Sequence, residues 1–405
     1  MMYQAYQAHA DLMWPLRAFA KLSVPLLMDP AYGDAAGATR RQMAAACRVL
    51  ELAEVTHKRP PWNIASVVDG GREVRVTEEA TLVTPFATLR RFRKDVSVAQ
   101  PRVLIIAPMS GHFATLLRDT VRTMLGDHDV YVTDWHNVRD VPLSAGRFGL
   151  DEYTGHLVDF LAAMGPGAHV MAICQPSVSA LAAVALMSED HHPATPLSLT
   201  LMAGPIDCRI NPTEVNRLAV AKPIEWFEKN LISHVPLRHP GAGRRVYPGF
   251  VQLSAFMSMN RERHVNAFND YYAHLVADEF DKAEVTRTFY EEYMAVADLS
   301  ADFYLETVRL VFQEYALPRG ELRVRGRTVD PALIRRTALL TIEGERDDIC
   351  SVGQTLAAQD LCTGLRPYLR THYVQPGVGH YGVFSGKRWQ NHIYPVVRDV
   401  IHVSQ

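Results

Sequence analysis

The chain has 405 residues and a mass of 45.4 kDa, and 48% of its residues are hydrophobic and 21% charged. This composition is that of a globular protein and excludes a disordered or fibrous one. Lys and Arg number 42 and Asp and Glu 44, which argues against a nucleic-acid-binding protein because phosphates require a basic surface. The five cysteines are far apart in the sequence, so we expect reduced thiols without disulfides and without a metal site. We also expect no cofactor.

The beginning of the sequence is unlike that of a secreted or membrane protein. Polar residues interrupt the first dozen positions and the first basic residue is Arg17, whereas a secretory signal needs a basic start and a continuous apolar run. No apolar run approaches the roughly 20 residues that span a bilayer. We therefore expect a cytoplasmic protein without a transmembrane segment.

Residues 1–58 are expected to form an N-terminal helical segment. An apolar residue returns every three or four positions at its start, as on one face of a helix: Tyr3, Tyr6, Ala10 and Met13. Pro25, Pro30 and Gly33 interrupt this pattern, which resumes over residues 40–57.

Residues 59–205 begin with alternating apolar and polar positions at 73–76 and 80–83, which predict antiparallel strands. Short apolar runs then alternate with helical stretches. The predicted strands are residues 103–107, 130–132, 169–173 and 197–202, and the predicted helices are residues 115–125, 151–164 and 177–187. Strands that alternate with helices in this way predict a mainly parallel sheet covered on both faces.

The alternation stops after residue 205 and returns at residue 336. Residues 206–335 are rich in aromatic side chains and are expected to be largely helical. Strands are predicted again at 337–342 and 368–374, and helices at 355–362 and 388–402. We therefore expect an α/β domain in two parts, 59–205 and 336–405, interrupted by a helical cap.

Cys174 lies directly after the predicted strand at 169–173 and before a predicted helix. Open parallel sheets place their active sites at the carboxyl ends of strands. A sharp turn at this point would expose the thiol, and the backbone N–H of Gln175 could then stabilise an oxyanion. Taken alone, Cys174 fits a buried structural cysteine better, because most free cysteines are of that kind.

Asp347, its neighbour Asp348, and His380 follow the last two predicted strands, and each of them alone could be an ordinary loop residue. Together with Cys174 they give the order nucleophile, acid, histidine, which is that of the α/β-hydrolase fold. In such a triad the histidine takes the thiol proton and the carboxylate fixes its tautomer. We therefore predict Cys174, Asp347 and His380 as catalytic, with Asp348 as the alternative acid.

The surroundings of Cys174 depart from the usual Gly-x-Ser-x-Gly pattern, which is absent from the chain. Ala172 and Pro176 stand where glycines are usual. Alanine is small enough for the turn, and proline is favoured in the first turn of a helix because its missing N–H is not needed there. A sharp strand-to-helix turn at Cys174 is therefore compatible with these residues.

The chain resembles the intracellular poly(3-hydroxybutyrate) depolymerases, and the resemblance extends over nearly its whole length. The segments that carry it are Ala107-Pro108-Met109-Ser110-Gly111-His112-Phe113, Val130-Tyr131-Val132-Thr133-Asp134-Trp135, Cys174-Gln175-Pro176, Gly204-Pro205-Ile206-Asp207, Gly243-Arg244-Arg245-Val246-Tyr247-Pro248-Gly249-Phe250 and His380-Tyr381-Gly382-Val383-Phe384-Ser385-Gly386. The resemblance implies an α/β-hydrolase fold and ester hydrolysis, with the nucleophile, a cysteine in this family, at Cys174. It likewise points to Asp347 and His380.

Further site residues follow from position. Met109 and Ser110 come after the strand at 103–107, where the second oxyanion donor of such enzymes arises, and a backbone N–H of either is the candidate. The aromatic residues of the insertion, Trp226 and Phe227 among them, are expected to bind the polyester. We also expect the storage-granule surface to be contacted mainly through the insertion.

Two other functions remain open on sequence grounds. An acyltransferase or polyester synthase would use the same cysteine, although synthases usually keep the pattern Gly-x-Cys-x-Gly, from which Ala172 and Pro176 depart. A granule-binding protein without activity is the second alternative. For the hydrolase itself, the sequence leaves open whether water or coenzyme A accepts the acyl group.

Overall fold

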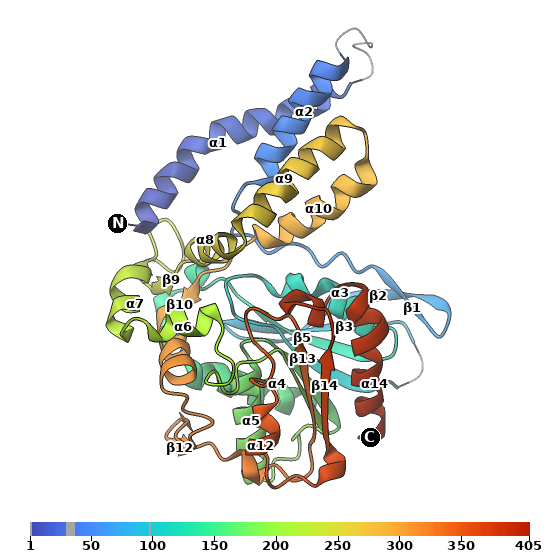
Figure 1. Ribbon diagram of the computed structural model, residues 1–405, viewed down its shortest axis with the longest axis vertical. Coiled ribbons are helices and arrows are strands. Elements are labelled where there is room, and N and C mark those ends of the chain that lie inside the picture. The colour runs from blue at the N-terminus through green and yellow to red at the C-terminus, as the bar shows by residue number, and fades with distance from the viewer. Residues whose placement is uncertain (1, 30–36, 97–98) are drawn as a thin grey trace.

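The computed structural model describes residues 2–29, 37–96 and 99–405, and its centre is a nine-stranded sheet (Figure 1). The strands are β1 (Ser66–Asp69), β2 (Arg72–Val83), β3 (Ala87–Lys94), β4 (Arg102–Ile106), β5 (Asp129–Trp135), β6 (Ala168–Ile173), β7 (Ser198–Met202), β13 (Ala338–Gly344) and β14 (Arg370–Gln375). Their order across the sheet is β1-β2-β3-β5-β4-β6-β7-β13-β14.

The sheet is antiparallel at one side and parallel over the rest. The pairs β1–β2, β2–β3 and β3–β5 are antiparallel, and every pair from β5 to β14 is parallel. The exchange of β4 and β5 in the order, after an antiparallel start, is that of the α/β-hydrolase fold. The predicted fold class and the predicted parallel sheet are therefore confirmed.

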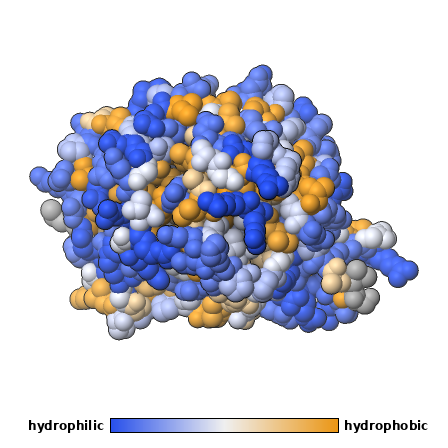
Figure 2. Space-filling model, turned by 90° about the horizontal axis from the view of Figure 1, so that it is seen from below, coloured by the Kyte–Doolittle hydropathy of each residue, from blue (hydrophilic) through white to orange (hydrophobic). Residues whose placement is uncertain are grey.

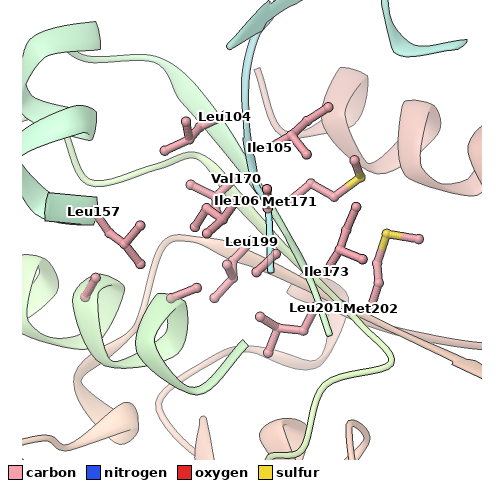
Figure 3. Packing of buried hydrophobic residues seen from close by; sticks show 14 of the residues in the cluster. Leu104, Ile105, Ile106, Leu157, Val170, Met171, Ile173, Leu199, Leu201 and Met202 are labelled. Carbon is pink, nitrogen blue, oxygen red and sulfur yellow. The ribbon is translucent and has the colours of Figure 1, made fainter. Parts of the chain in front are cut away.

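Helices cover both faces of this sheet, as Figure 1 shows. They are α3 (Arg118–Met124), α4 (Leu150–Met164), α5 (Ser177–Glu189), α12 (Ala357–Leu361), α13 (Gly386–Arg388) and α14 (Tyr394–Val403). The central strands are apolar on both sides because helices bury both faces. Leu104, Val170 and Leu199 illustrate this core, each no more than 2% exposed (Figure 3). Burying such a side chain stabilises the fold by about 1.5–3 kcal/mol.

The insertion forms a second group of helices and short strands. It comprises α6 (Glu214–Val220), α7 (Ile224–Leu231), α8 (Gly249–Met259), α9 (Arg261–Val276), α10 (Phe280–Tyr293) and α11 (Ala301–Thr307), with the short strands β8 (Ser233–His234), β9 (Arg245–Tyr247), β10 (Leu299–Ser300), β11 (Arg323–Val324) and β12 (Arg327–Thr328). Helices α8, α9 and α10 lie together at one end of the molecule, whereas the β11–β12 hairpin lies at the other end, where Arg327 pairs with Glu189 and Asp190 (Figure 1). The largely helical character expected for this part of the chain is confirmed. Its limits at residues 206 and 335 stay a prediction.

The N-terminal segment forms two helices, α1 (Met2–Leu27) and α2 (Gly37–Leu52). Helix α1 packs against α2, and α2 packs against α9 and α10 (Figure 1). The expected interruption at Pro25 is wrong, because α1 continues to Leu27. Pro25 lies in the last turn of the helix, where its missing N–H removes a single backbone hydrogen bond. The expected breaks at Pro30 and Gly33 lie outside the described residues.

A buried carboxylate joins the start of α1 to the start of α8. The hydroxyl of Tyr3 donates to Oδ2 of Asp298 at 2.6 Å, and the backbone N–H of Gly249 donates to Oδ1 at 2.9 Å. Asp298 is fully buried, and burial raises its pKa to about 6. His57 lies nearby with its Nδ1 at 3.9 Å from Oδ1, and burial lowers the pKa of His57 to about 3.

The outer face of α1 exposes a row of large apolar side chains. Their exposed fractions lie between 50% and 76%: Leu12, Leu16, Phe19, Leu22 and Leu26. Trp14 is 66% exposed as well, but its position along the helix places it on another side. On the opposite end of the molecule, hydrophobic side chains are instead scattered among hydrophilic ones (Figure 2). Among the described residues, no helix is both long and apolar enough to cross a membrane.

Candidate active site

Cys174 occupies a sharp turn between β6 and α5. Its backbone φ is +66°, a left-handed conformation that is strained for a residue other than glycine. Two hydrogen bonds hold the turn, from the N–H of Cys174 to the carbonyl of Met202 at 2.7 Å and from the N–H of Ser177 to the carbonyl of Cys174 at 3.1 Å. A strained residue held in this way at the carboxyl edge of a sheet is the geometry of a nucleophile elbow.

Neighbouring residues make room for this turn. A Cβ atom on Gly204 would lie 2.0 Å from Oγ of Ser177 and 3.1 Å from the carbonyl oxygen of Cys174, so only glycine fits beside the elbow. Pro176 has a φ of −67° and caps the start of α5, in agreement with its expected place before a helix. Ala172 is fully buried within β6.

Asp347 and His380 form a buried hydrogen-bonded pair beyond the ends of β13 and β14. Nδ1 of His380 lies 2.7 Å from Oδ2 of Asp347. The other carboxylate oxygen of Asp347 accepts the backbone N–H groups of Ile349 at 2.9 Å and Cys350 at 2.8 Å. Asp348 is exposed and makes no such bond with His380 within the described part of the chain. The pairing therefore favours Asp347, whose catalytic role stays a prediction.

His380 also contacts the side chain of Cys174, so the structure brings the three predicted residues together. Burial of the ring opposes its protonation. Cys174 and Asp347 outweigh this effect, through their charges and through hydrogen bonds to the ring, and hold the pKa of His380 well above its ordinary value. An imidazole in this environment is suited to accept the proton of the thiol and to stay close to the resulting thiolate.

The predicted oxyanion donors lie at the ends of two neighbouring strands of the sheet, β4 and β6. Met109 and Ser110 follow β4, and Gln175 follows Cys174. No backbone partner is present for the N–H groups of these three residues among the groups that the structure describes. N–H groups without a backbone partner are available to a developing negative charge, and their role as oxyanion donors stays a prediction.

Helix α8 reaches the loop that carries Met109 and Ser110. A Cβ atom on Gly111, which has a φ of +88°, would lie 2.7 Å from Oε1 of Gln252. Gln252 therefore packs directly on the backbone of Gly111, and Oε1 is buried without a hydrogen-bond partner in the described structure. The cap thus contacts the proposed oxyanion loop without any intervening side chain.

A cavity of about 260 Å³ opens on the His380 side of the site. Its walls come from the loops after β13 and β14 and from the region of α8, α9 and α10. The residues are Phe256, Met259, Asn260, Arg263, His264, Phe289, Tyr290, Tyr293, Asp348, Ile349, Gly379, His380, Tyr381 and Gly382. Within the described residues, no cluster of histidine, cysteine or carboxylate side chains could hold a metal ion.

The structure does not bring Trp226 and Phe227 to this cavity. Phe227 is buried on the inner side of α7, and the ring of Trp226 packs edge-to-face against it at 5.4 Å between centroids. Their aromatic composition was the only reason to expect substrate contacts, and composition does not distinguish a lining residue from a packing residue. The expectation that Trp226 and Phe227 bind the substrate stays a prediction.

Sequence reasoning missed the cap residues of this cavity, among them Arg263. No local pattern singles out one arginine of a charged helix. Tyr381 had a signal, since it follows His380 within a segment that carries the family resemblance. Its ring packs against both the main hydrophobic core and the smaller cluster formed by α2 and the cap helices.

Comparison with protein families gives one match. Residues 203–405, which include Asp347 and His380 but not Cys174, match the family described as PHB de-polymerase C-terminus. A comparison with curated protein sequences gives no match.

Solved structures with related folds are distant in sequence. The 2-hydroxy-6-oxo-6-phenylhexa-2,4-dienoate hydrolase from Rhodococcus sp. strain RHA1 is 12% identical, with a TM-score of 0.45, and the match covers 81% of this chain and 99% of that one. A thermophilic esterase from Thermogutta terrifontis is 13% identical, with a TM-score of 0.41 and coverage of 83% and 97%. Similarity at this level carries no inference about activity.

Proposed function

The chain belongs to the PHB de-polymerase family, and on that premise we propose that it cleaves ester bonds of amorphous poly(3-hydroxybutyrate) and its oligomers. The reaction would use Cys174 as nucleophile, His380 as general base and acid, and Asp347 as the residue that orients the imidazole. One observation carries this proposal, the strained left-handed Cys174 in contact with the buried His380–Asp347 pair.

In the first half of the reaction, His380 takes the proton of the Cys174 thiol and the thiolate sulfur attacks the ester carbonyl carbon. The carbonyl oxygen becomes an oxyanion, which the N–H of Gln175 and that of Met109 or Ser110 would stabilise. The carbon–oxygen bond then breaks, and the protonated imidazole gives its proton to the leaving alkoxide. The products are a free 3-hydroxy end and an acyl-cysteine.

In the second half, His380 removes a proton from the acyl acceptor, which attacks the thioester carbonyl. The sulfur leaves as thiolate and recovers a proton from the imidazolium, so the enzyme returns to its starting state. With water as acceptor the product is a carboxylic acid, and with coenzyme A it is an acyl thioester. We propose water as the acceptor, in keeping with hydrolysis.

The test is release of soluble 3-hydroxybutyrate or its oligomers from amorphous polymer granules by the full-length protein. We expect wild type to release product, and Cys174→Ala to release none while keeping its fold. Rapid quenching during turnover should give a 3-hydroxyacyl mass increase on the peptide that contains Cys174. Granule binding without any release by wild type would favour the non-catalytic alternative, and release only with added coenzyme A would favour the transferase.

We further propose that the protein works at the granule surface, and that α1 makes the main contact. The large apolar side chains exposed in the insertion are spread over several elements, for example Trp226 on α7, Leu237 in a loop and Phe280 on α10. On α1, in contrast, the row of exposed leucine and phenylalanine side chains follows one side of a single helix. Its opposite side is already packed against the protein, where Tyr3 and Ala20 are buried.

A polyester granule is the partner that suits this row. The row lies on a convex helix rather than in a groove, so it suits an extended apolar surface better than a peptide. Apolar contact of this kind stabilises by about 25 cal/mol per Å² removed from water. The hydrogen bonds from Tyr3 through Asp298 to Gly249 connect α1 with the first residue of α8, which reaches the catalytic cavity.

A further inference from the structure

The cavity beside His380 lies on the side of the site where the alcohol would leave. Gly379, His380 and Tyr381 line it, whereas Cys174, Gln175 and Met109 are not among its described walls. The histidine delivers its proton to the leaving oxygen, so the part of the substrate attached to that oxygen must extend past the imidazole. The cavity is therefore in position to hold the leaving group rather than the acyl group.

The wall of this cavity offers a free phenol. Among the described residues, the hydroxyl of Tyr381 has no hydrogen-bond partner, in contrast to that of Tyr290, which lies 2.8 Å from Nδ1 of His264. The Tyr381 hydroxyl is close enough to Cys174 and Arg263 for the charge of each to act on it. Burial raises the pKa of Tyr381, so the phenol stays protonated and can donate a hydrogen bond.

The same wall offers a free cation. Arg263 lies in the first turn of α9, and no carboxylate of the described chain lies within ion-pair distance of it. Arg263 lines the same cavity as the aromatic side chains of Tyr290 and Tyr293. Asp348 lines the cavity too, but is exposed and unpaired with Arg263.

The proposed substrate explains why a donor and a cation would face this cavity. A polyester of 3-hydroxyacids has ester oxygens that only accept hydrogen bonds, so its binding site must supply donors. The alcohol part of each ester also carries a carboxyl group one methylene away from the carbon that bears the leaving oxygen. Inside the chain this group is an ester, and at the acid end it is a carboxylate.

Resting on the function proposed above, we propose that this cavity is the subsite for the leaving 3-hydroxyacid. The hydroxyl of Tyr381 donates to the carbonyl oxygen of its carboxyl group, and Arg263 binds the negative charge when that group is the free end of the chain. The enzyme then prefers to cut the bond nearest the acid end, and it releases a short 3-hydroxyacid at each turnover.

Three small esters test this subsite because they share one acyl group and one type of secondary alcohol. They are 3-butyryloxybutyrate, its methyl ester and the butyrate ester of 2-butanol, which lacks the carboxyl group. Cleavage of the butyryl ester gives the same butyryl-cysteine from all three, so differences in the rate of butyrate release arise in binding and acylation alone. We expect kcat/KM for wild type to fall in the order free acid, methyl ester, 2-butanol ester, by roughly tenfold for each lost interaction.

Two variants assign the interactions. Tyr381→Phe should lower kcat/KM for the free acid and the methyl ester by about tenfold, with little change for the 2-butanol ester. Arg263→Gln should abolish the preference of the free acid over the methyl ester and leave the other two substrates nearly unchanged. Arg261→Gln, on the same helix but outside this cavity, is the matched control and should keep the wild-type order.

The proposal is overturned if wild type does not distinguish the three esters, or if both variants keep its order. It is also overturned if Arg263→Gln raises only the KM for added coenzyme A, because the guanidinium would then bind a phosphate of the acceptor. Turnover of the 2-butanol ester by wild type, and its loss in Cys174→Ala, tests the proposed chemistry separately. A failure of the subsite and a failure of the catalytic function therefore give different results.

Discussion

Asp347 holds His380 through one carboxylate oxygen at 2.7 Å and is itself held through the other by two backbone N–H groups. Both oxygens are thus engaged, and the carboxylate cannot rotate away without losing three hydrogen bonds. An acid fixed in this way keeps Nδ1 of the imidazole occupied, which leaves the second ring nitrogen for the thiol. The arrangement predicts a large difference between two adjacent carboxylates.

Asp347→Asn should lower kcat on the order of 10³- to 10⁴-fold, because an amide favours the wrong imidazole tautomer and cannot balance the imidazolium charge. Asp348→Asn is the matched control, and because this side chain is exposed we expect only a small change. Steady-state kinetics on a soluble ester, with circular dichroism to confirm folding, measures both. A larger loss in Asp348→Asn would exchange the roles of the two acids.

The left-handed backbone at Cys174 predicts that a glycine at this position removes activity but relieves strain in the folded state. Cys174→Gly and Cys174→Ala should both be inactive, but glycine adopts a φ of +66° without strain. The glycine variant should therefore unfold at a higher denaturant concentration than the alanine variant, by about 1 kcal/mol in free energy. Equal stability of the two variants would mean that the turn carries no strain.

Alkylation of the thiols should single out Cys174. It is half-buried and contacts His380, whereas Cys208 and Cys350 are buried and burial raises the pKa of both thiols. Cys47 is also half-buried, but burial raises its pKa as well. Limiting iodoacetamide followed by peptide mapping should find Cys174 modified first.

Two variants control this labelling experiment. In Cys47→Ser, Cys174 should be labelled at the wild-type rate, since the accessible thiol that this variant removes is not the reactive one. His380→Ala should label more slowly at neutral pH, because the base that favours the thiolate is gone. Preferential labelling of Cys47 in wild type would contradict the assignment of Cys174 as nucleophile.

Asp298 should make stability depend on pH in a direction unusual for a carboxylate. Its pKa is raised to about 6 in the folded protein, above the value near 3.9 of an unfolded chain. Between pH 4 and pH 6 the folded state binds more protons than the unfolded state. The contribution of Asp298 to the free energy of unfolding is therefore fully present below about pH 4 and is lost as the pH rises through 6. The loss amounts to about 3 kcal/mol by linkage.

Asp298→Asn removes that contribution and isolates it from opposing groups such as His57. The pKa of His57 is lowered to about 3, so its own contribution is lost as pH falls below about 6.5. The free energy of unfolding of wild type minus that of the variant should decrease from pH 4 to pH 7. A difference that stays constant over this interval would contradict the raised pKa.

The apolar row on α1 should control granule binding. Leu16→Gln, Phe19→Gln and Leu22→Gln together should weaken sedimentation with amorphous granules at least tenfold, because each side chain contributes about 1.5–3 kcal/mol when buried. Glutamine preserves helix propensity, so α1 should stay folded. Hydrolysis of a short soluble ester should not change.

Two exposed residues of the insertion provide the matched control. Phe280→Gln and Val285→Gln alter α10, where both side chains are exposed, and should leave sedimentation unchanged. If these variants weaken binding and the α1 variants do not, the granule contacts the insertion instead. A third outcome is that wild type is a dimer, and that the α1 variants are monomeric but still bind granules. The row would then contact a second copy of the chain.

The central strands could be predicted because they are apolar on both faces, a pattern that depends only on neighbouring residues. The run at 169–173 lies within β6, and the helix expected at 151–164 is α4 with one residue added. The helix expected at 355–362 is only Ala357–Leu361. Before Ala357 the backbone is not an α-helix, because the N–H groups of Gly353, Thr355 and Leu356 donate to the buried carboxylate of Glu343. This tertiary contact has no local sequence pattern.

The site could be anticipated only where strand ends mark it. Cys174, Asp347 and His380 each follow a strand, and the sheet brings strand ends together whatever the cap does. Arg263 and Phe256 reach the cavity from cap helices whose packing depends on the whole insertion. Aromatic composition pointed to Trp226 and Phe227, which do not line this cavity because the packing of α7 depends on tertiary contacts, and their role in substrate binding stays a prediction.

The shared packing of Tyr381 has a thermal consequence. One ring belongs to both the main core and the cap cluster, so the cap cannot separate without uncovering a side chain beside the histidine of the site. The buried bond from Thr115 to Glu292 at 2.7 Å crosses the same boundary. Calorimetry should therefore show the insertion and the α/β core melting in a single endotherm, with no early transition from the cap.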